Sequence, residues 1–293
     1  MNTKKIVITG GAGFVGTNLI KYFLKKTKFK IISIDNYSSS TKKNHIKSSR
    51  VKYVKAHTKN INSVLNPKKI HSIFHFGEFA RIYQSFLQMD KCIESNSIGT
   101  NAVINFCLKN KIKLIYSATS ATLGNNGKDK NLSPYAYSKA INLEILENFK
   151  NCFNFKYETI YFYNVYGPRQ ICKGDMATVI GIFEDHFLKN KQMPVVRPGT
   201  QSRRFTHIND TVHVCYKAWK KDLNRHYIIS HQKSYSIKEV ASMFKKKIKY
   251  LPSRKGERFS STLVNKNLSN KMYKYYGAID LKDYIDNFIN NNS

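Results

Sequence analysis

The sequence predicts an α/β protein of the Rossmann type, built on a doubly wound parallel sheet with helices on both faces. Three observations favour this class. A β-branched run at residues 4–9 reads as a buried strand, a glycine-rich turn follows it, and a helix at residues 17–24 leads to a second strand that ends at Asp35. Strand, helix and strand in such a short stretch form a βαβ unit, whose strands lie parallel.

The alternation of strand and helix continues through the first half of the chain. The expected strands are residues 4–9, 29–34, 51–54, 72–76, 114–117 and 158–162, and the further helices are residues 91–109 and 136–150. Beyond about residue 165, prolines and glycines break the pattern into shorter elements. One helix is expected there at residues 236–246, capped by Ser234 or Ser236. We expect a Rossmann domain over residues 1–165 and a smaller substrate domain, interleaved with the sheet, over residues 166–293.

Composition excludes several classes of protein. Hydrophobic residues make up 41% of the chain, enough for a sizeable core. No apolar run reaches the length of about 18 residues that a membrane span needs. The cysteines are spread without a C-x-x-C pair, so we expect reduced thiols in a cytoplasmic protein, with no metal site. They are Cys92, Cys107, Cys152, Cys172 and Cys215.

The net charge of +32 has two interpretations. A nucleic-acid-binding protein is one, and a surface rich in solvated lysine is the other. Basic residues are scattered in short clusters such as residues 25–26, 68–69 and 245–247, which favours the second interpretation. We expect no nucleic-acid partner, although the positive field would attract an anionic small substrate.

The glycine-rich turn has the features of a dinucleotide site. Gly10 allows a tight turn out of the strand, Gly13 lets a pyrophosphate approach the backbone, and Gly16 allows the helix to pack closely on the sheet. The free N–H groups and dipole of the helix favour an anion. Asp35 follows Gly16 by 19 residues at the end of the second strand, where a carboxylate binds ribose hydroxyls. Since an acid there repels a 2′-phosphate, NAD is expected rather than NADP.

A second motif predicts redox chemistry on a substrate hydroxyl. Tyr135 and Lys139 form Y-x-x-x-K, and positions i and i+4 share one face of a helix. A free tyrosine has a pKa of about 10, and an adjacent ammonium lowers it toward the range of a useful base. Thr119 lies 16 residues before Tyr135, at the end of an expected strand.

With the G-x-x-G-x-x-G spacing, these motifs resemble the extended short-chain dehydrogenase/reductase family, in its NAD-dependent epimerase/dehydratase branch. The resemblance implies that Tyr135, Lys139 and Thr119 are catalytic and that NAD is the cofactor. It places at the cofactor Gly10, Gly13, Phe14, Val15, Gly16, Asp35, Asn36, His57, Phe76, Gly77, Asn96, Ser117, Tyr135, Lys139 and Tyr163. The substrate-binding residues that it implies are Arg81, Thr119, Ser120, Asn164, Arg203, Arg254 and Glu257.

The later motifs indicate a nucleotide-sugar substrate. Residues 162–169 are similar to the family's R-Y-F-N-V-Y-G-P segment, residues 199–210 to G-x-x-x-R-D-F-I-H-V-x-D, and residues 252–257 to P-x-R-x-G-D. The resemblance implies that Asn164 contacts the diphosphate, that Arg203 and Arg254 bind it, and that Glu257 holds the nucleoside ribose.

The residues after Thr119 decide between activities. Dehydratases of the family typically have Asp-Glu there, and this chain has Ser120-Ala121. We therefore expect a 4-epimerase of a UDP-hexose or UDP-N-acetylhexosamine, acting through a 4-keto sugar. A dehydratase or a 4-ketoreductase of the same family is the alternative, and a nucleic-acid-binding relative without activity is a more distant one.

Several positions depart from the family pattern. His57 stands where an Asp usually contacts adenine, Arg204 replaces an Asp, and Leu123 replaces a Tyr. Residues 75–81, His-Phe-Gly-Glu-Phe-Ala-Arg, replace H-x-A-A-x-x-S, so that Arg81 falls where a small Ser often touches the sugar. Family members commonly pair through two helices, so a homodimer through residues 91–109 and 136–150 is expected. The apolar residues offered for it are Ile93, Ile98, Ala102, Val103 and Phe106.

Overall fold

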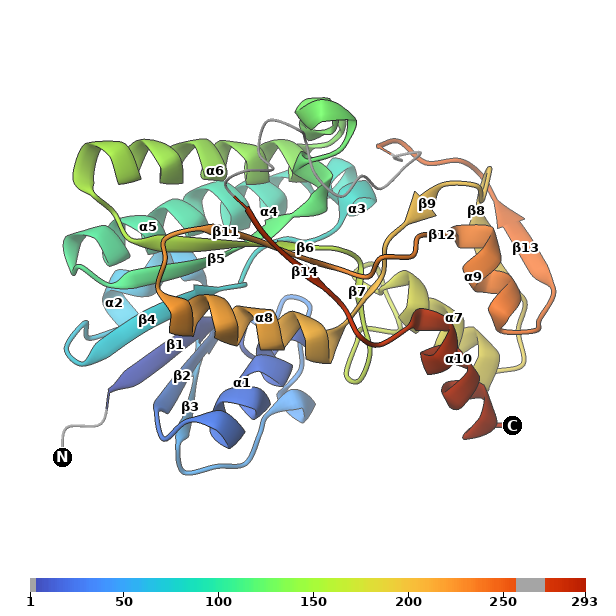
Figure 1. The fold of residues 1–293 in the computed structure, drawn as a ribbon, viewed down its shortest axis with the longest axis horizontal. Coiled ribbons are helices and arrows are strands. Elements are labelled where there is room, and N and C mark those ends of the chain that lie inside the picture. Colours follow the sequence, from blue (N-terminus) through green and yellow to red (C-terminus); the bar gives the residue numbers. More distant parts are fainter. Residues whose placement is uncertain (1–3, 257–271) are drawn as a thin grey trace.

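An eight-stranded parallel sheet forms the centre of the computed structural model, which describes residues 4–256 and 272–293 (Figure 1). Every pair of neighbouring strands in this sheet is parallel. Its strands are β1 (Lys5–Thr9), β2 (Lys30–Asp35), β3 (Val51–Lys55), β4 (Ile70–His75), β5 (Lys113–Thr119), β6 (Tyr157–Phe162), β11 (His226–Ser230) and β14 (Met272–Tyr276).

The strand order creates a switch point. The order is β14-β11-β6-β5-β4-β1-β2-β3, so the chain winds outward from β1 to β3 and then returns to start a second half at β4. In a doubly wound sheet, ligands bind at the carboxyl ends of the strands where the winding reverses. The loops that follow β1 and β4 lie at this point, and the predicted fold class is confirmed.

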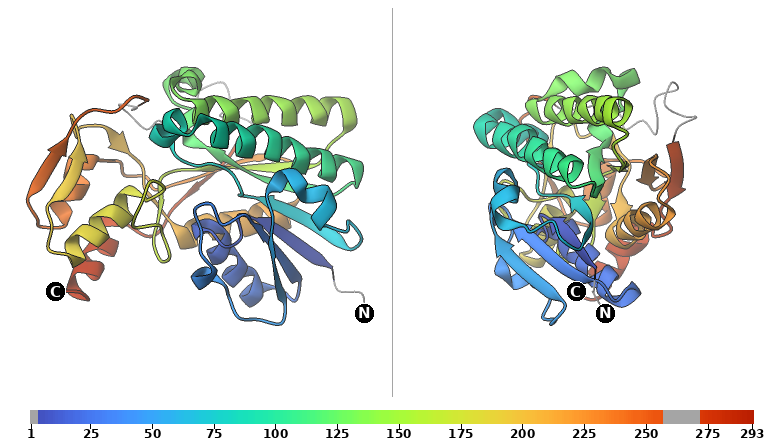
Figure 2. Two further views of the ribbon diagram at one scale, coloured as in Figure 1. Left: turned by 180° about the vertical axis from the view of Figure 1, so that it is seen from behind. Right: turned by 90° about the vertical axis from the view of Figure 1, so that its left-hand side faces the viewer.

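Two layers of helices cover the sheet (Figure 2). One core packs residues of α2, α5 and α6 against the sheet, and the other packs residues of α1 and α8 against its opposite face. The helices are α1 (Phe14–Lys26), α2 (Ile61–Val64), α3 (Ile82–Leu87), α4 (Met89–Ile93), α5 (Thr100–Lys109), α6 (Pro134–Phe153) and α8 (Ile208–Lys221). The 3-10 turns are η1 (Lys42–Asn44), η2 (Thr58–Asn60), η4 (Ser120–Thr122) and η5 (Asn125–Leu132).

The expected strands are all present, and most differences are at element ends. The helix predicted over residues 91–109 is interrupted by a π-helical turn, η3 (Glu94–Gly99), between α4 and α5. The helix predicted at residues 236–246 ends earlier, as α9 (Ile237–Met243), because Lys245 has a left-handed φ of 54°. Ser236 caps α9 through a capping box with Glu239, so one of the two predicted caps is confirmed.

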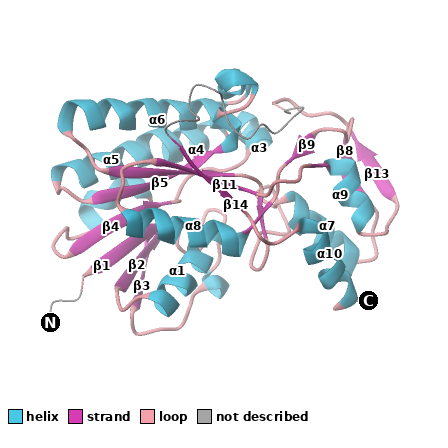
Figure 3. Cartoon of the chain, in the orientation of Figure 1, coloured by secondary structure: helices cyan, strands magenta, loops and turns pink. Residues whose placement is uncertain are grey.

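A smaller lobe lies beyond the carboxyl ends of the strands (Figure 3). Its own core joins α9 to α7 (Val179–Leu188), α10 (Leu281–Asn290) and β8 (Met193–Val196). Short strand pairs tie it together: β8 with β13 (Ile248–Leu251), β9 (Ser202–Arg203) with β12 (Tyr235–Ser236), and β7 (Val165–Tyr166) with β10 (Thr206–His207). The strands β11 and β14 belong to the second half of the chain yet extend the main sheet, and a domain boundary at residue 165 stays a prediction.

Among the described residues, no helix is both long enough and apolar enough to cross a membrane.

Candidate active site

The predicted residues converge on the carboxyl edge of the sheet. Residues 10–13 follow β1, Asp35 ends β2, residues 76–81 follow β4, and Thr119 ends β5. Strand register fixes their order, since Thr9 lies beside His75 and His75 beside Tyr116. Segments far apart in sequence therefore form one site.

The glycine turn is shaped by close backbone contacts. Gly10 has a φ of 66°, and a Cβ there would lie 2.8 Å from the Phe76 carbonyl oxygen. A Cβ on Gly16 would overlap the Gly10 carbonyl oxygen, so Gly16 is needed for folding. A Cβ on Gly13 would lie 3.1 Å from the Gly10 carbonyl oxygen, a close contact that the turn would have to relieve by a small shift. The tight turn at Gly10 and the close approach at Gly16 therefore require glycine more strictly than Gly13 does.

The start of α1 suits an anion. Its N-cap residue, Gly13, has no side chain that could cap the helix, and no acidic residue lies in the first turn. The N–H groups of a helix N-terminus then remain available to an acceptor, and the dipole favours negative charge. Phe14, which begins the helix, is buried, whereas Val15 is half-buried beside it. The turn fits a dinucleotide pyrophosphate.

Asp35 is held by the loops around it. Its Oδ2 accepts a bond from Ala12 N at 3.0 Å, and its Oδ1 accepts bonds from Tyr37 N and Ser40 Oγ, both at 2.8 Å. A carboxylate has about four acceptor positions. Asp35 thus couples the glycine turn to the end of β2 while keeping capacity for a ribose hydroxyl. Asn36 beside it is exposed.

Tyr135 and Lys139 lie on the first turns of α6. The helix begins at Pro134 and is capped by Ser133, whose side chain accepts a bond from Ala136 N at 3.1 Å. Tyr135 N donates to Ser85 Oγ at 3.2 Å, which docks this turn on α3. The spacing of four residues places both on one face of α6, as the sequence predicts, and Lys139 reaches the end of β5.

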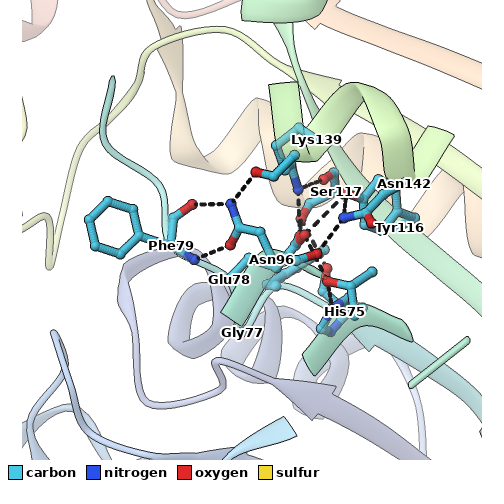
Figure 4. Close-up of polar contacts among 12 residues, drawn as sticks. His75, Gly77, Glu78, Phe79, Asn96, Tyr116, Ser117, Lys139 and Asn142 are labelled. Carbon is cyan, nitrogen blue, oxygen red and sulfur yellow. Dashed lines mark hydrogen bonds and ion pairs between the residues drawn. The ribbon is translucent and has the colours of Figure 1, made fainter. Parts of the chain in front are cut away.

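Lys139 forms a buried ion pair with Glu78 (Figure 4). Its Nζ lies 2.5 Å from Glu78 Oε2, and each side chain is only 4% exposed. Nζ also donates to the Ser117 carbonyl oxygen and lies 4.3 Å from the centre of the Tyr116 ring. Burial lowers the pKa of Lys139, and the Glu78 carboxylate opposes that shift.

Glu78 is surrounded by donors. Its Oε1 accepts from the Tyr116 and Thr100 hydroxyls, each at 3.1 Å, and the Ser117 hydroxyl lies 3.2 Å from Oε2. Asn96 fixes the loop that carries Glu78, because its side chain bonds both the N–H and the carbonyl of Phe79 and donates to Ser138 of α6. Figure 4 shows these groups facing one another between β4, β5 and α6.

Sequence reasoning missed Glu78. A signal was present, because Glu78 stands at the second alanine of the H-x-A-A pattern that this segment replaces. In that segment the sequence pattern assigned a substrate role to Arg81, at the position of the common serine, and no role to Glu78. The sequence did not reveal that the unusual acid would meet Lys139.

Thr119 is the last residue of β5. It is 8% exposed, and its Oγ1 accepts a bond from Ala121 N at 3.2 Å. Ser120 and Ala121, which follow in η4, are buried. The position between the β5 end and α6 is consistent with a hydroxyl that contacts a reacting oxygen.

Arg81 lies near Tyr135 with its guanidinium withdrawn from solvent. It donates to the carbonyl oxygens of Ala80 and Met176, at 2.7 and 2.5 Å. Burial lowers the pKa of Arg81, and the charge of a Tyr135 phenolate would oppose that shift. Arg81, which is predicted to bind the substrate, therefore lies close enough to Tyr135 to interact with it electrostatically.

Two residues predicted to bind the diphosphate lie where the smaller lobe meets the sheet. Arg203 lies in β9 and is buried. Asn164 Nδ2 donates a hydrogen bond to the backbone carbonyl of the following residue, Arg204, at 2.9 Å. The Arg204 guanidinium donates hydrogen bonds to the backbone carbonyls of His231 and Gln232.

Arg254, the central residue of the P-x-R-x-G segment, contacts the ring of Tyr83. Its guanidinium carbon lies 4.9 Å from the centre of the Tyr83 ring, on the helix that starts after Arg81. The predicted ribose ligand Glu257 lies outside the described residues.

The remaining predicted cofactor residues have varied surroundings. Phe76 N and Gly77 N donate to Thr9 Oγ1, Ser117 Oγ donates to the His75 carbonyl, and the Tyr163 side chain is buried. His57 caps η2 by accepting from Lys59 N, and burial lowers its pKa, which favours the neutral imidazole that the adenine role needs. Asn96 is fully buried with its amide engaged by protein groups.

The chain is similar in sequence and in fold to known nucleotide-sugar enzymes. Over 303 residues the chain is 26% identical to a putative UDP-glucose 4-epimerase of Methanocaldococcus jannaschii, with 97% of each chain covered. It superposes with a TM-score of 0.85 and 21% identity on a UDP-glucose 4-epimerase from Thermotoga maritima with UDP-glucose, covering 98% of this chain and 97% of the other. It also superposes, at a TM-score of 0.84 and 17% identity, on a dTDP-glucose 4,6-dehydratase from Streptomyces venezuelae with NAD, covering 98% and 96%.

The family is shown by a model of the NAD dependent epimerase/dehydratase family, which matches residues 6–230 and so spans the glycine turn, Thr119, Tyr135 and Arg203. The chain therefore belongs to the NAD-dependent epimerase/dehydratase family, which confirms the predicted family and the predicted cofactor NAD.

Proposed function

We propose that this enzyme is a UDP-sugar 4-epimerase that inverts C4 of a UDP-hexose or UDP-N-acetylhexosamine. NAD, which the glycine turn and Asp35 would hold, would supply the hydride acceptor that a 4-keto sugar intermediate requires. Similarity over nearly the full chain to a putative UDP-glucose 4-epimerase supports this choice.

The catalytic roles proposed for this chain are those of a base and an oxygen ligand. Tyr135 removes the proton from the C4 hydroxyl as the C4–H bond breaks and returns it to the new hydroxyl. Thr119, at the end of β5, donates a hydrogen bond to the C4 oxygen. Lys139, one turn after Tyr135, provides the ammonium that favours the phenolate.

A single observation carries the choice of epimerase over dehydratase. Removing water across C5 and C6 needs an acid and a base next to the reacting sugar, and Ser120 and Ala121 occupy the positions where dehydratases have them. Glu78 is the carboxylate at the catalytic lysine, but both of its oxygens are engaged by Lys139, Tyr116 and Thr100. A carboxylate held in this way is poorly placed to act as the missing base.

The substrate diphosphate is assigned to the arginines of the smaller lobe. Arg203 and Arg254 offer guanidinium groups that bind phosphate with paired hydrogen bonds. Arg81 is assigned to the sugar side, because it lies near Tyr135. The cytoplasmic location expected from the cysteines stays a prediction.

The test is incubation of the purified protein with UDP-glucose or UDP-N-acetylglucosamine in D2O, followed by NMR of the products. An epimerase gives the 4-epimer with no solvent deuterium in the sugar, because the same hydride returns. A dehydratase exchanges the C5 hydrogen with solvent and forms a 4-keto-6-deoxy sugar. Deuterium at C5, or consumption of added NAD without an epimer, would contradict the proposal.

A matched pair of variants tests the base. Tyr135→Phe should abolish epimerisation, whereas Tyr137→Phe should not, since Tyr137 lies on the same helix with its side chain 53% exposed. Mass spectrometry of ligands released from the denatured Tyr135→Phe protein should still detect NAD. Equal activity of the two variants would exclude Tyr135 as the base.

We also propose that the chain forms a homodimer through α4, η3 and α6. Ile93 and Ile98 are 42% and 55% exposed, whereas Val103 and Phe106, also offered from sequence, are core residues at 0% and 2%. Replacement of Ile98 by Lys should convert a dimer into a monomer in light scattering, and an unchanged mass would exclude this surface.

A further inference from the structure

The environment of Lys139 differs from that of a lysine which faces solvent. Of its three N–H bonds, one is directed to Glu78 Oε2 and another to the Ser117 carbonyl oxygen. The side chain is 4% exposed. An ammonium group at such a depth is disfavoured against the neutral amine unless an opposite charge compensates it.

Two chains of hydrogen bonds lead to Glu78 Oε1, and both end in a donor. Thr9 Oγ1 accepts the N–H groups of Phe76 and Gly77, so its own proton is directed to His75 Nδ1 at 2.7 Å. Burial lowers the pKa of His75 to about 4, so the ring is neutral and its proton lies on Nε2.

That proton is shared with Thr100 Oγ1, 2.9 Å away, so the Thr100 hydroxyl is free to donate to Glu78 Oε1. On the other side, Tyr116 accepts a bond from Asn142 and so donates its own proton to the same oxygen. Both chains of hydrogen bonds end in donors at Glu78 Oε1, and Lys139 Nζ donates to Oε2. The Ser117 hydroxyl, which donates to the His75 carbonyl at 2.9 Å, lies 3.2 Å from Oε2.

The other titratable groups that face Lys139 do not supply negative charge. Burial raises the pKa of the Tyr116 hydroxyl on β5 and of the Cys92 thiol on α4, so both are neutral at physiological pH. His75 on β4 is neutral as well. Among the groups found to interact with Lys139 in the described part of the chain, Glu78 is the compensating charge.

We propose that Glu78 is a positioning residue: its carboxylate holds Lys139 protonated and fixed next to the Tyr135 turn of α6. The participation of Lys139 in turnover rests on the proposed function. Its protonation state does not, and it can be measured without a substrate.

The direct test is NMR of protein labelled with [13Cε]lysine. The Lys139 signal is the one that disappears in Lys139→Met. Replacement of Glu78 by Gln keeps the size of the side chain and removes the charge, so the midpoint of the Lys139 titration should fall by at least about one pH unit. A midpoint that moves by less than about half a unit would overturn the proposal.

A matched control uses the other buried glutamate that pairs with a lysine. Glu158 lies 2.9 Å from Lys113 and is fully buried at the opposite end of the sheet. Glu158→Gln should leave the Lys139 titration unchanged. If both variants shift it equally, a general loosening of the fold explains the result and the proposal fails. If Glu78→Gln does not fold, Glu78→Ala, which restores the common alanine of the segment, replaces it.

The pH dependence of turnover gives a second readout. Because Glu78→Gln lowers the pKa of Lys139, its kcat should fall at least about tenfold near pH 9 while changing little near pH 6.5, and Glu78→Asp should recover part of the loss. An equal loss at both pH values, without recovery by Asp, would indicate a structural role and contradict the proposal. If no UDP-sugar is turned over, the proposed function fails, and the NMR titration alone still decides the role of Glu78.

Discussion

Two buried lysine–glutamate pairs lie at opposite ends of the same strand. Lys113 begins β5 and pairs with Glu158 of β6 at 2.9 Å. Lys139 pairs with Glu78 at 2.5 Å, beside the residues that end β5. The chemistry of the two pairs is the same, and their surroundings differ.

The pair at the amino end holds backbone segments together. Glu158 accepts bonds from Asn224 N at 3.0 Å and Arg225 N at 2.7 Å, in the turn between α8 and β11. Lys113 also bonds Asp222 in that turn, at 2.5 Å. These contacts connect the starts of β5 and β6 to the chain that enters β11.

The pair at the carboxyl end is surrounded instead by side chains of the catalytic region. Glu78 accepts from Tyr116 and Thr100, and Lys139 lies one helical turn after Tyr135. In doubly wound sheets, ligands bind at the carboxyl ends of the strands. Two pairs of the same chemistry are therefore expected to serve different roles: Lys139–Glu78 should affect activity, and Lys113–Glu158 should affect stability.

The largest change in activity is expected from a substitution at the carboxyl end of the strands. Tyr135→Phe should reduce kcat by about 10²–10⁴-fold, since proton transfer by a positioned side chain contributes that much. Lys113→Met, at the other end, should leave kcat within about twofold, since it contacts none of the proposed catalytic residues. Steady-state kinetics on folded protein measures both, and a large loss in the Lys113 variant would break the comparison.

The next effect concerns stability at the amino end. Glu158→Ala leaves Lys113 buried without this partner and removes the acceptor of two backbone N–H groups. Breaking a buried pair in this way costs about 3–5 kcal/mol of unfolding free energy. Urea titration checks the loss, and an unfolding free energy within about 1 kcal/mol of the wild type would contradict it.

A smaller effect is expected at the glycine turn. A Cβ at Gly13 would lie 3.1 Å from the Gly10 carbonyl oxygen, which the turn can relieve by a small shift. In the proposed NAD complex the same Cβ would face the pyrophosphate. Gly13→Ala should therefore weaken NAD binding about tenfold, which is about 1.4 kcal/mol, while the NAD-free protein stays folded. Calorimetric titration of NAD measures this, and unchanged affinity would remove Gly13 from the predicted cofactor residues.

The smallest effect is expected from Asp222. Its hydrogen bond with Lys113 lowers its pKa in the folded state, so the carboxylate stabilises the fold above its unfolded pKa of about 4 and the benefit disappears as pH falls through the folded value. Its side chain is 59% exposed, so Asp222→Asn should cost less than about 1 kcal/mol at pH 7. Urea titrations at pH 7 and pH 3 should show this difference shrinking at the lower pH, and a constant difference would mean that charge is not the cause.

The sequence by itself determined the features that depend on local spacing. The glycines of the first turn, the acid at the end of β2 and the tyrosine and lysine one helical turn apart are all readable along the chain, because backbone geometry fixes their relation within a few residues. The alternation of strands and helices gave the fold class for the same reason. The π-helical turn at Glu94–Gly99 was not predicted, since helical periodicity persists through it.

Only the tertiary structure decided which charges meet. Glu78 and Lys139 are 61 residues apart, and Lys113 and Glu158 are 45 apart. Their contacts depend on the register of β4, β5 and β6 and on the docking of α6, which no local pattern encodes. Glu78 shows this most clearly: from the sequence it is an acid in place of an alanine, and the packing of β4, β5 and α6 makes it the partner of Lys139, the proposed catalytic lysine.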